Sequence, residues 1–138
     1  MRLIAAAALL IAQNEFSCSA PPLVVTFETC ANNAVTVQVT TGVTPVYKWS
    51  PSCGMSRLMV SPDTSFAAVW AVYGDAAPNN NSIGSSVRYG QAPENGRVVA
   101  GPERLQRGVT YRVEVSRLVC DQGAVCVLVP AGAARFQP

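Results

Sequence analysis

The residues best suited to chemistry in this sequence are its cysteines, and their spacing favours disulfide bonds over metal or redox sites. In an exported chain of this size, cysteines usually pair to stabilise the fold. Cys120 and Cys126 flank a predicted hairpin turn and can face each other across its strands, where closing so short a loop would add roughly 2 kcal/mol. Zinc is excluded because the chain has neither a C-x-x-C pair nor a histidine. The same spacing argues against a redox site.

The other three cysteines, Cys18, Cys30 and Cys53, leave two pairings open. If Cys18 carries a lipid, Cys30 and Cys53 form the natural second bridge. If Cys18 stays a thiol, it can bridge Cys30 and leave Cys53 free. The even count favours the first alternative, whereas Glu15 and Phe16 are poor residues before a lipidation site and oppose it.

Catalytic residues are not expected, because the sequence contains no histidine, which is the commonest general base and metal ligand. Serine nucleophiles therefore lack a partner base. Carboxylates do occur near predicted turns, but turns attract Asp and Glu for conformational reasons and no two of these form a recognised catalytic pair. We therefore expect a non-enzyme without a cofactor or metal. The carboxylates considered are Asp63, Asp75, Glu94, Glu103 and Asp121.

The charge of the chain argues against a nucleic-acid partner. Its formal net charge is only +2, and 13% of its residues are charged, whereas a nucleic-acid surface needs clustered basic groups. Several arginines fall in one third of the chain, at spacings that alternating exposed positions on a sheet would produce. We interpret them as a solvated face, with an anion-binding patch as the less favoured alternative. They are Arg88, Arg97, Arg104, Arg107, Arg112 and Arg117.

The N-terminus resembles a secretory leader. Met1 and Arg2 precede an apolar run over residues 3–12, which is too short to cross a bilayer. We expect residues 1–20 to direct export and residues 21–138 to form a single domain located in the periplasm, on the outer membrane or outside the cell. Because residues 21–138 contain no run approaching the roughly 20 apolar residues of a spanning helix, membrane attachment would require a lipid on Cys18.

The rest of the chain reads as short strands separated by turns, which predicts an all-β antiparallel sandwich of about seven to eight strands. Residues 66–73 (FAAVWAVY) are apolar at nearly every position, so this strand should be covered on both sides or serve as a contact edge for self-assembly. A slip in alternation at Ser116 and Arg117 predicts a bulge. The expected strands are residues 23–29, 34–41, 44–51, 57–60, 66–73, 87–89, 97–99, 111–115, 118–120 and 125–129, with 133–136 closing the last strand.

Two stretches carry a resemblance to fibronectin type III and related Ig-like bacterial domains. Leu105, Gly108 and Tyr111 resemble the corner that enters strand F in that family, where the tyrosine hydroxyl bonds back to the backbone. The string PVYKWSPSCGMSRLMV resembles an earlier strand pair, in which Trp49 would be a core residue. The resemblance covers about residues 45–136 and extends to uncharacterised exported proteins or lipoproteins of bacteria.

The resemblance implies a fold, and function must be argued from sites on that fold. We expect a non-enzymatic module that binds a protein or carbohydrate ligand, or spaces other molecules, through the loops at the ends of the sandwich. One alternative is a subunit of an envelope assembly that makes contact through residues 66–73. The other is an enzyme or enzyme inhibitor that acts through the end loops.

Overall fold

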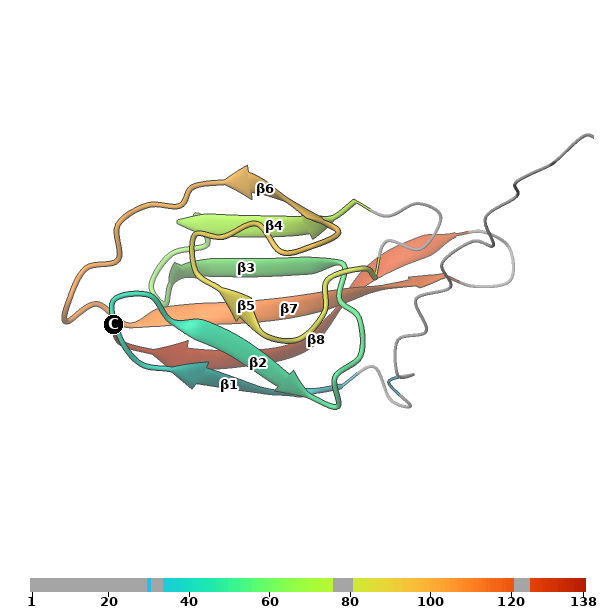
Figure 1. Cartoon of the computed structure of the whole chain (residues 1–138), viewed down its shortest axis with the longest axis horizontal. Helices are drawn as coiled ribbons and strands as arrows, with labels where there is room; N and C mark the ends of the chain where they lie inside the picture. The colour runs from blue at the N-terminus through green and yellow to red at the C-terminus, as the bar shows by residue number, and fades with distance from the viewer. Residues whose placement is uncertain (1–29, 31–33, 76–80, 121–124) are drawn as a thin grey trace, which may run out of the picture.

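The computed structural model describes residues 30, 34–75, 81–120 and 125–138, and this part of the chain contains strands and turns but no helix (Figure 1). The expected strand at residues 23–29 and the turn at Asp121 lie outside the described residues. The eight strands are β1 (Thr36–Thr40), β2 (Val46–Ser50), β3 (Arg57–Pro62), β4 (Trp70–Gly74), β5 (Val87–Arg88), β6 (Gly96–Ala100), β7 (Tyr111–Cys120) and β8 (Cys126–Phe136).

The strands form two antiparallel sheets that face each other across one core. One sheet has the order β1-β2-β5, and the other has the order β6-β4-β3-β7-β8. Both sheets contribute to the same cluster of buried side chains, which includes Tyr47 and Trp49 from the smaller sheet and Val60, Trp70 and Val113 from the larger one. The fold is therefore all-β and consistent with a sandwich (Figure 1).

Alternation along β7 explains how this strand positions its side chains. Tyr111, Val113 and Val115 point into the core, whereas Arg112 and Glu114 lie on the outer face of the sheet. Successive residues of a strand point to opposite faces, so the sequence pattern determines which face is buried. The rings of Tyr111 and Phe136 stack inside, with their centroids 5.8 Å apart.

The strand expected at residues 66–73 begins later than predicted and lies inside the larger sheet. Strand β4 begins only at Trp70, and Phe66 lies in the preceding loop with 98% of its surface exposed. β4 pairs with β3 on one side and with β6 on the other. Its first three residues, Trp70, Ala71 and Val72, are all buried. The apolar composition reflects this interior position, so β4 is not a free edge of the sheet, while self-assembly through residues 66–73 stays a prediction.

The bulge lies close to where the sequence predicted it, but the extra residue is on the other strand. Val115 pairs with Gly132 and the next residue, Ser116, pairs with Pro130, which leaves Ala131 as the unmatched residue of β8. The carbonyl of Ala131 accepts a hydrogen bond of 2.9 Å from the amide of Val35. The bulge thus joins the edge of one sheet to the segment leading into β1.

Beyond this bulge, β7 and β8 continue as a hairpin that projects past the other strands (Figure 1). The side-chain amide of Asn81 replaces a neighbouring strand here, because its Nδ2 donates to the Leu118 carbonyl at 2.8 Å and its Oδ1 accepts from the Leu118 amide at 2.7 Å. Val127 and Leu128 are exposed on this hairpin. A disulfide between Cys120 and Cys126 joins its strands, as predicted.

The second disulfide joins Cys30 to Cys53, with the two Cα atoms 5.7 Å apart. The sequence left two pairings open, and the structure has the one that joins Cys30 to Cys53 and does not use Cys18. Cys18 itself lies outside the described residues. Cys53 is fully buried and its carbonyl accepts a 2.8 Å hydrogen bond from Nε1 of Trp49, which is also buried. The bridge thus holds Cys30 against the core beside this tryptophan.

Candidate functional site

In the loop between β6 and β7 (residues 101–110), three hydrogen bonds fix residues 103–106 to the sandwich. The amide of Glu103 donates to the Val69 carbonyl at 2.9 Å, and the Tyr89 hydroxyl donates to the Glu103 carbonyl at 2.6 Å. Farther along the loop, the amide of Gln106 donates to the Tyr111 hydroxyl at 3.0 Å. Two buried tyrosines and the residue before β4 therefore hold this part of the loop against the sandwich.

The hydrogen bond at Tyr111 runs from a backbone donor to the side-chain oxygen. The hydroxyl reaches backbone upstream of its strand, but it accepts from an amide and does not donate to a carbonyl. Gly108 lies between Gln106 and Tyr111 and has a φ of +80°, with open space around it. Leu105 packs against the edge of the core. The group that loses its partner without the hydroxyl is therefore the Gln106 N–H.

Tyr111→Phe should lower the free energy of unfolding by about 1 kcal/mol or more, because it leaves a partly buried N–H donor without its acceptor. Urea denaturation of both proteins measures the difference. Tyr73→Phe is the matched control, since Tyr73 lies partly exposed on the outer face of the sheet. Equal stability of the wild type and Tyr111→Phe would remove the role of this hydroxyl in holding the loop.

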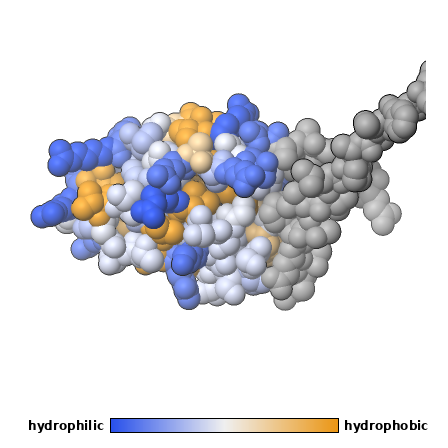
Figure 2. Space-filling model, viewed as in Figure 1, coloured by the Kyte–Doolittle hydropathy of each residue, from blue (hydrophilic) through white to orange (hydrophobic). Residues whose placement is uncertain are grey.

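An open groove of about 840 Å³ lies at the end of the sandwich where this loop meets the β1–β2 loop and the end of the chain. Figure 2 shows hydrophilic side chains projecting around a hydrophobic patch at this end. Residues of both kinds form its lining, from segments far apart in the sequence. They are Gly42, Val43, Tyr89, Arg104, Leu105, Gln106, Arg107 and Pro138.

Two cations at the groove, Arg104 and Arg107, are exposed and have no ion-pair partner among the described residues. Both come from the fixed β6–β7 loop. Val43, with 86% of its surface exposed, belongs to the apolar part of the lining. The groove therefore combines an exposed apolar surface with two guanidinium groups that are available to a ligand.

Tyr89 is the buried wall of the groove. Its ring packs against Trp70 with the centroids 5.0 Å apart. Burial raises the pKa of Tyr89 to about 12, with smaller contributions from the nearby Tyr111 and Glu103. Burial also raises the pKa of Tyr47, a core residue of β2. Both tyrosines are therefore neutral at physiological pH.

The protein should lose stability above pH 10. Because the pKa values of Tyr89 and Tyr47 are higher in the folded state than the ordinary value of 10.0, the folded state holds these protons more tightly than the unfolded chain. This contribution is complete below pH 10 and is lost as the pH rises toward 12 and beyond. Urea midpoints at pH 8, 10 and 11.5 test it, and Tyr89→Phe should flatten the decline. A midpoint that stays constant to pH 11.5 would contradict it.

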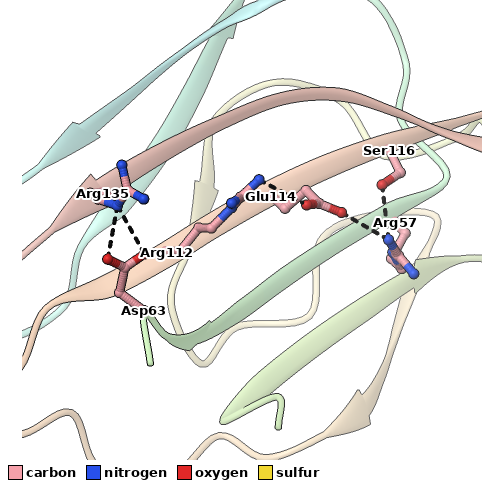
Figure 3. Close-up of polar contacts among 6 residues, drawn as sticks. All are labelled: Arg57, Asp63, Arg112, Glu114, Ser116 and Arg135. Carbon is pink, nitrogen blue, oxygen red and sulfur yellow. Dashed lines mark hydrogen bonds and ion pairs between the residues drawn. The ribbon is translucent and has the colours of Figure 1, made fainter. Parts of the chain in front are cut away.

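The remaining charged cluster lies on the outer face of the larger sheet and is internally paired (Figure 3). Glu114 accepts from Arg57 at 3.0 Å and from Arg112 at 3.3 Å, while Asp63 accepts from Nε of Arg135 at 2.8 Å. Arg57 also donates to the Ser116 hydroxyl at 3.1 Å. These pairs lie at the surface, with Glu114 partly buried, and surface ion pairs add little stability. Their main effect here is to neutralise these arginines, in contrast to those at the groove.

The predicted carboxylates do not assemble into one site. Asp63 is ion-paired on the sheet face, Asp75 follows β4, Glu94 lies in the turn before β6, and Glu103 lies in the β6–β7 loop. Across the described ranges, no group of three or more His, Cys, Asp or Glu side chains is placed to hold a metal ion. The same part of the chain contains no helix of the length and apolar character needed to cross a membrane.

Sequence reasoning missed the groove residues Val43 and Tyr89, and for Arg104 and Arg107 it favoured a solvated face over an anion-binding patch. The two arginines were grouped with alternating positions of a sheet, but they lie in a loop, and only others such as Arg97 and Arg112 occupy exposed strand positions. The sequence signal that could have placed Arg104 and Arg107 in a loop is their position on either side of Leu105 and Gln106, just before the predicted corner at Gly108 and Tyr111.

Fold and groove together define a disulfide-bonded, all-β protein with a potential binding site at the end of its sheets. Comparison with known proteins gives no family assignment: the chain matches no protein-family model, no curated protein and no solved structure. The likeness to fibronectin type III domains therefore remains a prediction.

Proposed function

We propose that this chain is a non-enzymatic, exported β-sandwich module that binds another molecule at its end groove. The observation that supports this proposal is the groove itself, which is lined by apolar side chains and by two arginines without an ion-pair partner in the described part of the chain. Two buried tyrosines hold the loop that carries these arginines. Binding sites of small molecules are concave, mostly apolar and carry a few placed polar groups. Loops presented by a rigid scaffold are also the usual place for such contacts.

We also propose that the sandwich is of the fibronectin type III or Ig-like kind. Sandwiches of this class place strands A, B and E opposite C, F and G. The order β1-β2-β5 opposite β3-β7-β8 supports that assignment, with β4 and β6 extending the second sheet beyond β3. The hydroxyl of Tyr111 at the start of β7 supports it further, because this is where the corner tyrosine of strand F belongs.

Thermal-shift measurements against a panel of organic acids, amines, sugars and short peptides test the binding proposal. Wild-type protein should be stabilised by at least one chemical class, and Val43→Asp should abolish the effect by placing a carboxylate in the apolar part of the groove. Phe66→Asp is the matched control, because Phe66 is an equally exposed apolar loop residue that does not line the groove. A response that is absent in the wild type, or equal in all three proteins, would overturn the proposal.

A second candidate function is that of a subunit in an envelope or extracellular assembly. The observation that favours it is the projecting β7–β8 hairpin, whose Val127 and Leu128 are exposed. Light scattering after size-exclusion chromatography decides between the two functions. A stable oligomer that Val127→Asp converts to monomer supports assembly, whereas a monomeric wild type at high concentration supports an isolated module.

Export is part of the proposal, and both disulfides are compatible with an oxidising location. If the protein is anchored to a membrane, Cys18 is the residue that would carry the lipid. Cell fractionation of the native gene and a Cys18→Ser variant tests this anchor. Release of the variant alone from the membrane fraction supports lipidation, and equal solubility of both proteins rules it out.

A further inference from the structure

We propose that the ligand of the end groove is an amphipathic organic anion, with an apolar body and one carboxylate or similar acidic group. This inference rests on the proposed binding function and names its ligand class. The apolar body would lie against Val43 and Leu105, and the acidic group would pair with Arg104 and Arg107.

Charge complementarity is the first argument for an anion. Arg104 and Arg107 are the charged side chains that line the groove, and neither has an ion-pair partner among the described residues. On the outer face of the larger sheet, Arg57, Arg112 and Arg135 are already paired with Asp63 or Glu114. A guanidinium presents a planar fork that matches a carboxylate, and such charge-assisted hydrogen bonds are among the strongest in proteins.

Preorganisation is the second argument. The two arginines flank Leu105 and Gln106, and the amide of Gln106 is bonded to the buried Tyr111 hydroxyl. The Glu103 carbonyl on the other side is bonded to the Tyr89 hydroxyl. The backbone that carries both cations is therefore fixed before any ligand arrives, so binding costs less ordering of the loop.

The apolar lining is the third argument, because it excludes a purely inorganic anion as the best ligand. Val43, Leu105 and Pro138 offer hydrocarbon surface, and a small hydrated ion would leave this surface exposed to water. A ligand that covers it gains the free energy of apolar burial in addition to the ion pair. A cationic ligand would be repelled by the two guanidinium groups, and a sugar would cover the apolar lining less well than a hydrocarbon body.

A matched pair of fluorescent probes separates the two contributions. 1-Anilinonaphthalene-8-sulfonate carries an acidic group, and N-phenyl-1-naphthylamine has the same aromatic body without it. Wild-type protein should bind the sulfonate probe about tenfold more tightly than the neutral one, as expected for a net gain from charged hydrogen bonds. Arg104→Gln combined with Arg107→Gln should abolish this preference and leave the affinity for the neutral probe within about twofold.

Two further variants control for charge and for other apolar surfaces. Lys48→Gln combined with Arg97→Gln removes the same net charge from exposed strand positions away from the groove and should keep the preference. Phe66→Asp should keep the binding of both probes, while Val43→Asp should weaken both. Circular dichroism and urea midpoints establish that every variant is folded.

The outcomes distinguish the ligand class from the binding function itself. If both probes bind equally and Val43→Asp weakens both, the groove is a binding site but the anion preference is wrong. If the charge-matched control loses the preference as well, the attraction is a general effect of net charge and the proposal is also overturned. If neither probe responds to Val43→Asp, the groove does not bind this class and the proposed function fails with it.

Discussion

Gly101→Ala is expected to destabilise the protein by about 3 kcal/mol or more. Gly101 has a φ of +65°, a left-handed conformation that costs an L-residue roughly 1–2 kcal/mol. A Cβ at this position would also collide with the backbone carbonyl of Val69. That carbonyl accepts the Glu103 amide, so moving it would weaken a further hydrogen bond worth about 1 kcal/mol and release the start of the β6–β7 loop.

Gly108→Ala separates the two causes. Gly108 has a similar φ of +80°, but an added Cβ would meet no other atom within 4 Å. This variant should therefore cost only the roughly 1–2 kcal/mol of the left-handed backbone. Urea denaturation of the two variants beside wild type gives the difference. Equal losses would mean that the Val69 carbonyl moves aside without cost, and the loop would then be less constrained than its hydrogen bonds indicate.

Removing the Cys30–Cys53 bond is the second change with a large expected effect. The bond closes a loop with a sequence separation of 23 residues, for which the chain-entropy model gives about 3 kcal/mol. The variant is Cys30→Ala with Cys53→Ala, because Cys53 is fully buried and alanine adds no polar group to the core. Urea midpoints under non-reducing conditions measure the loss.

The hairpin disulfide provides the internal control for loop length. Cys120 and Cys126 are only 6 residues apart, so their paired replacement by alanine should cost about 2 kcal/mol. Both cysteines lie on the exposed part of the hairpin, where little packing is lost. A larger loss from this pair than from Cys30 and Cys53 would contradict the loop-entropy account.

Local patterns predicted the strands well where one face of a strand is buried. The alternation from Tyr111 to Val115 gave both the strand and its inward face, because a half-buried strand repeats every two residues. The same signal failed at Phe66 and Ala67, since a continuous apolar run does not reveal where pairing begins. Only the neighbours β3 and β6 determine that β4 starts at Trp70.

The groove could not be predicted from the sequence because distant parts of the chain form it. Val43 comes from the β1–β2 loop, Tyr89 follows β5, and Arg104 lies in the β6–β7 loop. Their proximity depends on the packing of two sheets, for which no local period exists. The disulfide pairing was predictable in part. Cys120 and Cys126 are close in the sequence and imply a hairpin bridge, whereas only the tertiary fold decides that Cys30 pairs with Cys53.

The Cys30–Cys53 bond also determines how a mechanical load would travel through this protein. Tension applied to the chain on the N-terminal side of Cys30 passes through the disulfide to Cys53 and bypasses residues 31–52. Strands β1 and β2 lie inside that covalent loop and would not be pulled apart, while β3 is the first strand along the path. Residues 121–125 are bypassed in the same way at the hairpin. Stretching the oxidised protein should therefore extend a shorter length of chain than stretching the reduced one.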